Sequence, residues 1–195
     1  YGNDGNGANS GHVRIYQWDG AAWIQRGNDI DGEAGYDYSG KSVSLSADGT
    51  IVAIGTDQND GNGVNSGHVR IYQWNETQWI QRGQDIDGEA EYDFSGSSVT
   101  LSTDGNIVAI GAYGNDGNGA YSGHVRIYQW NETQWIQRGN DIDGEAASDE
   151  SGSSVSLSAD GNIVAIGARG NDGNGVNSGH VRIYQWNETQ WIQRG

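Results

Sequence analysis

The sequence contains no cysteine, no proline and no methionine, and only 10 of its 195 residues are lysine or arginine. Without cysteine the chain has no disulfide framework and no thiolate metal site. The absence of methionine at position 1 indicates a processed product or a piece of a longer protein. No apolar run approaches the roughly 18 residues of a membrane span, and no signal peptide is recognisable.

The few basic residues face 26 aspartates and glutamates, which gives a formal net charge of −16 and a pI of about 4.2. Nucleic acid and anionic membrane surfaces are not expected as partners, because phosphate binding needs clustered lysine and arginine. Cations, basic proteins and polar glycans stay open as ligands. Glycine supplies 33 residues, far above the usual ~7%, and indicates a turn-rich all-β protein.

One eight-residue segment, Gly-His-Val-Arg-Ile-Tyr-Gln-Trp, occurs four times, at Gly11–Trp18, Gly67–Trp74, Gly123–Trp130 and Gly179–Trp186. Each copy starts 56 residues after the one before it. A fixed period of this length means that the chain is an array of one supersecondary unit. Copies so similar leave no single position that stands out as a catalyst.

Each unit carries the pattern of four strands. In the unit that begins at Ser95, alternation or apolar runs predict strands over 98–102, 107–110, 124–130 and 135–138. An Asp-Gly turn separates the first two strands, and a glycine-rich loop precedes the third. A four-stranded meander has two faces to cover, and stacking such sheets around an axis covers them. The expected fold is therefore an all-β β-propeller built of four-stranded antiparallel blades.

In this register the chain holds about three and a half blades. The expected segments are a partial blade with strands three and four at 1–38, followed by blades at 39–94, 95–150 and 151–195. An open arc exposes two apolar sheet faces, so that further repeats or a second copy are expected to close the ring.

Two motifs of the unit resemble FG-GAP repeats, which build integrin α-subunit propellers and many secreted proteins. They are Ser-Gly-x-Ser-Val at Ser39–Val43, Ser95–Val99 and Ser151–Val155, and Asp-Gly-x-Ile-Val-Ala-Ile-Gly at Asp48–Gly55, Asp104–Gly111 and Asp160–Gly167. The resemblance implies a seven-bladed ring in an extracellular or cell-surface protein. The calcium loop of many family members is reduced here to one carboxylate, so that the family's calcium site is not carried over.

An acidic linker between units is a separate candidate for Ca²⁺, since four carboxylates fall within nine residues around a Gly turn. The candidate ligands are Asp29, Asp31, Glu33, Asp37, Asp85, Asp87, Glu89, Asp93, Asp141, Asp143, Glu145 and Asp149. The alternative is a solvated loop whose Asp side chains cap backbone N–H groups. The glycine-rich loops at Gly2–Gly7, Asn59–Gly63, Gly114–Gly119 and Gly170–Gly175 are expected to be turn-forming rather than cation sites.

Three sequons, at Asn75, Asn131 and Asn187, lie at predicted hairpin tips and are candidate N-glycosylation sites. The tryptophan pairs beside these tips are expected to pack blades together, with sugar stacking as the alternative. One histidine per unit (His12, His68, His124, His180) is expected to serve packing, since no second His or Cys stands at zinc-ligand spacing. Arg14, Arg70, Arg126 and Arg182 are expected to pair with acidic residues of a neighbouring unit.

These observations predict a non-enzymatic structural or adhesion propeller, acidic and extracellular, with a protein or glycan partner. The alternative is a carbohydrate-binding propeller with one weak site per blade. Catalysis is not expected, because near-identical blades offer no pair of carboxylates in different environments.

Overall fold

The computed structural model describes residues 2–195, and these residues form only β-strands, turns and irregular loops. No helix in this range is long and apolar enough to cross a membrane. The N-terminal strands are β1 (His12–Val13), β2 (Tyr16–Trp18), β3 (Trp23–Gln25) and β4 (Ile30–Asp31). The first complete sheet contains β5 (Ser42–Leu45), β6 (Ile51–Thr56), β7 (His68–Trp74), β8 (Trp79–Gln81) and β9 (Ile86–Asp87).

The same strands recur in the second complete sheet, as β10 (Ser98–Leu101), β11 (Ile107–Ala112), β12 (His124–Trp130), β13 (Trp135–Gln137) and β14 (Ile142–Asp143). The third sheet contains β15 (Ser151–Leu157), β16 (Ile163–Ala168), β17 (His180–Trp186) and β18 (Trp191–Gln193). In each sheet the strands pair in chain order, and every pair is antiparallel. This is the meander that the repeat predicts.

The outer strand of the first two complete sheets is broken, which the sequence does not predict. β8 pairs with the end of β7, whereas β9 pairs with its beginning, where Asp87 lies opposite His68. The break falls at Gly83, whose φ of +86° is unfavourable for other residues. As a result, the acidic linker runs past the start of β7 and brings its carboxylates to the histidine.

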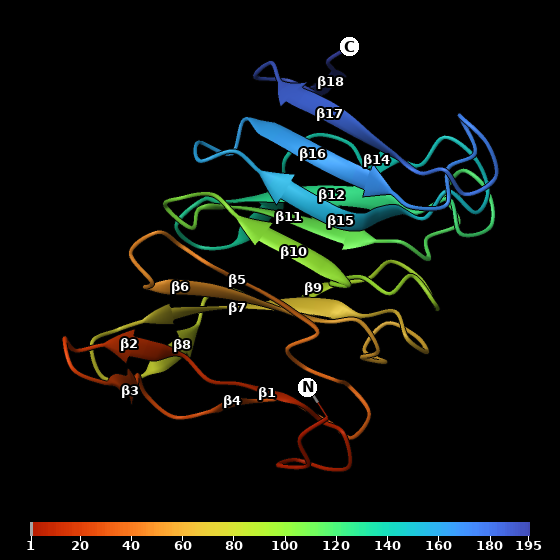
Figure 1. Cartoon of the computed structure of the whole chain (residues 1–195). Helices are drawn as coiled ribbons and strands as arrows, with labels where there is room; N and C mark the ends of the chain where they lie inside the picture. The colour runs from red at the N-terminus through yellow and green to blue at the C-terminus, as the bar shows by residue number, and fades with distance from the viewer. Residues whose placement is uncertain (1) are drawn as a thin grey trace.

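The sheets stack face to face along the chain, from the N-terminal strands to the C-terminal sheet (Figure 1). Side chains from successive sheets form shared cores, as where Val69 and Ile71 of β7 meet Val108 and Ile110 of β11. Strand β6 is buried along its whole length, because sheets cover both of its faces. That double cover explains why its sequence is a continuous apolar run rather than an alternating one.

Polar contacts also repeat at each junction between sheets. The indole Nε1–H of Trp79 donates to the carbonyl of Arg26 in the preceding unit at 2.7 Å, and Trp135 and Trp191 do the same one and two units later. The Arg26 guanidinium lies 4.9 Å from the Trp74 ring centroid, in cation–π range. The prediction that the tryptophan pairs join blades is therefore confirmed.

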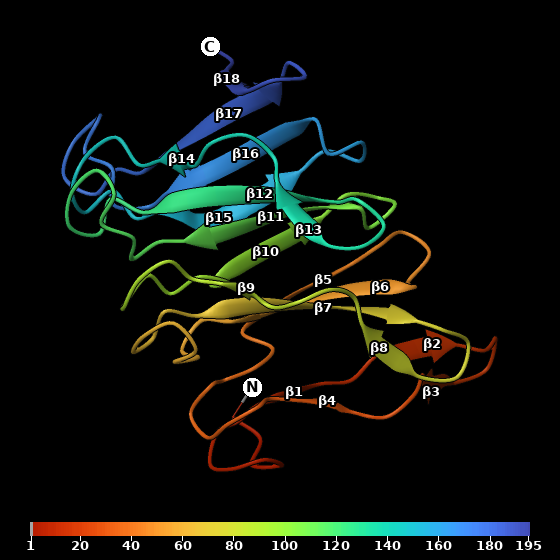
Figure 2. The ribbon, with the colours of Figure 1, turned by 180° about the vertical axis from the view of Figure 1, so that it is seen from behind.

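The two ends of the stack expose side chains that are buried at the inner junctions. Val181 and Ile183 of β17 are 65% and 42% exposed, whereas Val125 and Ile127, their counterparts in β12, are 0% and 1% exposed. The two environments differ because a following sheet covers β12 only. Seen from behind, the sheets follow one another from β1–β4 at one end of the stack to β17 and β18 at the other (Figure 2).

Candidate functional site

The junctions between sheets form grooves along the outer edge of the stack. At the first junction an acidic groove of about 300 Å³ is lined by Asn28, Asp29, Ile30, Asp31, Tyr72, Gln78 and Trp79. At the third junction the equivalent groove of about 280 Å³ is lined by Asn140, Asp141, Ile142, Asp143, Tyr184, Gln190 and Trp191. Each residue of the second set lies 112 positions after its counterpart in the first. We call these two surfaces the acidic grooves.

Both acidic grooves combine aromatic rings with carboxylates and amides. The rings of Tyr72 and Trp79 come from the later sheet, while Asp29 and Asp31 come from the linker of the earlier unit. This mixture of apolar platforms and hydrogen-bonding groups is typical of sites that bind polar small molecules. Four of the carboxylates predicted as calcium ligands, Asp29, Asp31, Asp141 and Asp143, therefore line grooves shared by two units.

A second kind of groove also combines residues of two successive units. One, of about 400 Å³, is lined by Gln17, Asp19, Ile24, Gln25, Arg26, Gly27 and Trp74. Its counterpart one unit later, of about 440 Å³, is lined by Gln73, Trp74, Asn75, Ile80, Gln81, Arg82, Gly83 and Trp130. In these grooves an arginine, Arg26 or Arg82, takes the place of the aspartate pair of the acidic grooves. Both kinds of groove therefore recur along the stack.

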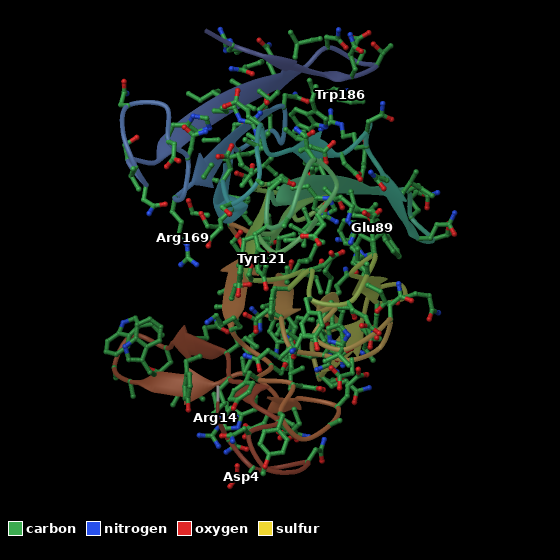
Figure 3. All side chains as sticks on the ribbon, turned by 90° about the vertical axis from the view of Figure 1, so that its right-hand side faces the viewer. Asp4, Arg14, Glu89, Tyr121, Arg169 and Trp186 are labelled. Atoms are coloured by element: carbon green, nitrogen blue, oxygen red, sulfur yellow. The ribbon has the colours of Figure 1, made fainter. Side chains whose placement is uncertain are left out.

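Histidine and carboxylates meet where the linker passes the start of the third strand. His68 Nδ1 lies 3.9 Å from Glu33 Oε2 of the preceding unit and 3.9 Å from Asp85 Oδ2 of its own linker. One unit later, His124 Nδ1 lies 3.8 Å from Glu89 Oε2 and from Asp141 Oδ2. Glu89 lies between the sheets of β7 and β12 in the stack (Figure 3).

Burial sets the electrostatics of these clusters. Desolvation, assisted by the nearby Arg70 guanidinium, lowers the pKa of His68 to about 4, so that its imidazole is neutral at pH 7. Desolvation also raises the pKa of Glu33 above its ordinary value, against the opposing pull of Arg70. The Arg70 Nη1 atom lies 3.7 Å from Glu33 Oε1. Arg126 and Glu89 repeat this contact at 3.6 Å.

The arginine pairing predicted from the sequence holds for these two inner copies. At the first copy Arg14 instead binds Asp29 of its own unit, with Nε and Nη2 each 2.9 Å from Oδ2. In the last sheet Arg182 donates to the Asp143 carbonyl and to the Tyr184 hydroxyl, as Arg70 does to Asp31 and Tyr72. Arg182 differs from the inner copies in having no carboxylate partner within 4.0 Å among the described residues.

The remaining acidic residues of the predicted calcium set separate from the clusters. Asp37 is buried and accepts hydrogen bonds from the Ala34 N–H at 2.9 Å and from Asn59 Nδ2 at 3.3 Å. Asp93 and Asp149 repeat this arrangement in the next two linkers. The four carboxylates of one linker therefore face different partners, and these three aspartates cap backbone N–H groups, the alternative weighed above. Calcium binding by the twelve residues stays a prediction.

The glycine-rich loops are held by side-chain-to-backbone hydrogen bonds of the kind that shape turns. Asn171 Oδ1 accepts from the Gly173 N–H at 2.9 Å, and Asp172 Oδ1 accepts from the Asn177 N–H at 2.7 Å. The sequon asparagines also shape turns, since Asn75 Oδ1 accepts from the N–H groups of Thr77 and Gln78. The sequon side chains are exposed at the β7–β8, β12–β13 and β17–β18 turns.

Two comparisons with known proteins bear on this arrangement. Residues 142–184 match the family model of the FG-GAP repeat, which confirms the repeat type identified from the motifs. No curated protein sequence matches the chain. The other units carry the same motifs at the same spacing.

Solved structures identify the architecture. A protein provisionally named 6-phosphogluconolactonase from Bacteroides uniformis matches with a TM-score of 0.59 at 12% identity, over 95% of this chain and 47% of that one. The periplasmic gluconolactonase PpgL of Pseudomonas aeruginosa matches with a TM-score of 0.56 at 15% identity, over 89% and 46%. The β-propeller expectation is confirmed, and the chain spans about half the length of these propellers.

The expectation of a non-enzymatic chain is contradicted by the same neighbours, since the proteins that share this fold bear the names of lactonases. The argument from near-identical blades treated each unit as a separate environment, whereas the junctions combine residues of two units and differ between the ends and the middle of the stack.

Sequence reasoning missed the role of the histidines as junction residues. The search for a second His or Cys close in sequence found nothing, because the partners of His68 come from two linkers, at Glu33 and Asp85. One signal was available: the histidines and the acidic linkers share the same 56-residue period. By contrast, the pairing of neighbouring strands within each sheet follows directly from the motifs.

Proposed function

We propose that this propeller arc is an extracellular adhesion module that binds glycans in the acidic grooves. The observation that carries the proposal is the recurrence of one groove, with the same seven residue positions, at two junctions. The Tyr72 and Trp79 rings supply platforms for the apolar face of a sugar ring. The carboxylates and amides accept and donate hydrogen bonds to its hydroxyls.

An extracellular location is supported by the FG-GAP repeat match and by the three sequons at exposed turns. The net charge of −16 supports neutral or basic glycans over acidic ones, because like charges repel at a surface of this kind. Several weak equivalent sites on one rigid arc suit adhesion, since linked sites raise the overall avidity far above that of each site.

The test is a glycan array followed by calorimetric titration with the best ligand. We expect two equivalent sites, and Asp31→Ala with Gln78→Ala should remove one of them. Adding Asp143→Ala and Gln190→Ala should remove the second. Val176→Ala, at a position that is 86% exposed in the loop between β16 and β17, is the matched control and should change nothing. Binding that survives all four substitutions would reject the acidic grooves as the site.

A second candidate is hydrolysis of a sugar lactone, which the names of the two structural neighbours and the imidazole–carboxylate clusters favour. Incubation with gluconolactone in a pH-stat measures acid release directly. Turnover that is lost in His68→Gln with His124→Gln would support an active site at the junctions. A rate equal to that of buffer alone would leave glycan binding as the proposed function.

A further inference from the structure

The two inner histidine clusters have the spacing of cation ligands. In each cluster the imidazole nitrogen and the two carboxylate oxygens lie within 4.8 Å of one another. The imidazole–carboxylate distances of 3.9 Å at His68 and 3.8 Å at His124 are too long for hydrogen bonds. They approach the ~3.4 to 3.6 Å that separates two ligand atoms bound to one zinc ion at ~2.1 Å.

The burial of the imidazole is an independent observation that points to a ligand. His68 and His124 are each 1% exposed, and in both rings Nε2 lacks a hydrogen-bond partner within the described chain. Both Nδ1 atoms point at the carboxylates. Nδ1, rather than Nε2, is therefore the atom at which a cation would bind each ring.

The donor set selects the kind of cation. Ca²⁺ and Mg²⁺ take oxygen ligands almost entirely, whereas zinc and the neighbouring transition metals accept imidazole nitrogen together with carboxylate oxygen. We propose that each inner cluster, Glu33–His68–Asp85 and Glu89–His124–Asp141, binds one divalent zinc-type cation. The side chains of Glu33 and Glu89 are 45% exposed, so that solvent reaches each site and a coordination position stays open to water.

The ligands of one site come from two units, which makes the ion a tie between sheets. Glu33 precedes β5, while His68 and Asp85 belong to the sheet that β5 begins. Binding of the ion to the folded state alone must therefore stabilise the junction. Ligand atoms of His12, Asp29 and Asp31 also lie within 4.8 Å of one another, but there Arg14 binds Asp29 and no glutamate takes part. His180 has only Glu145 nearby among the described residues, at 3.6 Å.

The test is metal titration of chelator-treated protein with Zn²⁺, read by calorimetry and by elemental analysis after gel filtration. We expect two ions per chain, one in His68→Gln, and none in the double variant His68→Gln with His124→Gln. His180→Gln is the matched control and should keep both ions. Because replacing a buried histidine can unfold a sheet, Glu33→Gln with Glu89→Gln is the second variant. The Glu33 and Glu89 side chains are half exposed, and this double variant should also abolish Zn²⁺ binding.

Substitution of Co²⁺ reads the donor set separately from affinity, because imidazole and carboxylate ligands give an absorption band that free Co²⁺ lacks. A thermal scan should show a higher Tm with Zn²⁺ for the unmodified chain and an unchanged Tm for the double variant. The proposal is overturned by fewer than one ion per chain, by uptake that persists in Glu33→Gln with Glu89→Gln, or by Ca²⁺ binding in place of Zn²⁺. None of these readouts depends on glycan binding.

Discussion

Replacing the same isoleucine by alanine in two copies of one strand separates the effect of the neighbouring sheet from that of the sequence. Ile127 and Ile183 both lie in His-Val-Arg-Ile-Tyr-Gln-Trp strands, and their exposed fractions are 1% and 42%. Differences in strand propensity cancel between the two substitutions. What differs is the cover, since Ile127 packs against Val164 and Ile166 of the next sheet.

The expected magnitudes follow from burial. Ile→Ala removes about three carbon groups at ~0.8 kcal/mol each, or roughly 2.4 kcal/mol of transfer free energy. At Ile127 a cavity term brings the loss of unfolding free energy to about 3.5 kcal/mol. At Ile183 roughly 60% of the side chain is buried and water fills the vacated space, so that the loss is about 1.5 kcal/mol. The predicted difference is about 2 kcal/mol.

The assay is urea unfolding, followed by tryptophan fluorescence and by far-ultraviolet circular dichroism, at a concentration where the chain is monomeric. Comparable m-values are required, because a change in m signals that one sheet unfolds separately. Equal losses within about 0.5 kcal/mol would refute the reasoning, since they would mean that the stacked neighbour adds nothing to the burial of Ile127.

Three further predictions test local features. Glu132→Gly should raise the free energy of unfolding by about 0.5–1 kcal/mol, measured by urea titration. The reason is that Glu132 has a φ of +78°, at a turn position where the first copy has Gly20. A loss of stability would contradict this. Hydrogen bonds lower the pKa of Asp160 to about 2, with the larger effect from the Ser158 hydroxyl and the next from the Asn162 N–H. Carboxyl NMR should therefore show that Asp160 titrates near pH 2. The stability from the ionised form is complete above pH 3.8 and lost as pH falls through about 2; a midpoint near 3.8 would disprove the hydrogen bonding. In a secretory eukaryotic host, Asn75→Asp, Asn131→Asp and Asn187→Asp should each remove one glycan mass but keep the turn, as Asp19 does in the first copy; an unchanged mass would show the sequons unused.

The strand order could be predicted from the sequence because it depends on local signals. Alternation in the His124–Trp130 strand and the Asp104-Gly105 turn determine which residues pair within a sheet. The break in the outer strand could not be predicted from the sequence. It depends on the positive φ of Gly83 and on the Trp130 and Trp135 rings, which a Cβ at position 83 would meet. Those rings belong to the next sheet, and a single unit does not contain them.

The same distinction explains why site residues were harder to predict than the fold. Asp31 was identified by its charge, but Tyr72, its partner in the acidic groove, lies 41 positions later and in another sheet. The carboxylates of one linker, adjacent in sequence, point to different partners: Asp29 to Arg14, Glu33 to His68 and Asp37 to Asn59. Proximity along the chain was therefore a poor guide to which carboxylates act together.

The number of sites on such an array should follow the number of units that have both a preceding acidic linker and an acidic linker of their own, rather than the number of histidines. The His-Val-Arg-Ile-Tyr-Gln-Trp strand occurs four times, yet only the copies at His68 and His124 have both a preceding glutamate and a following aspartate beside the imidazole. Each cluster takes its glutamate from the linker before the sheet and its aspartate from the linker after it. Valence would then grow by one per added unit. A repeat protein built this way gains binding sites by duplication without any change in the sequence of the unit.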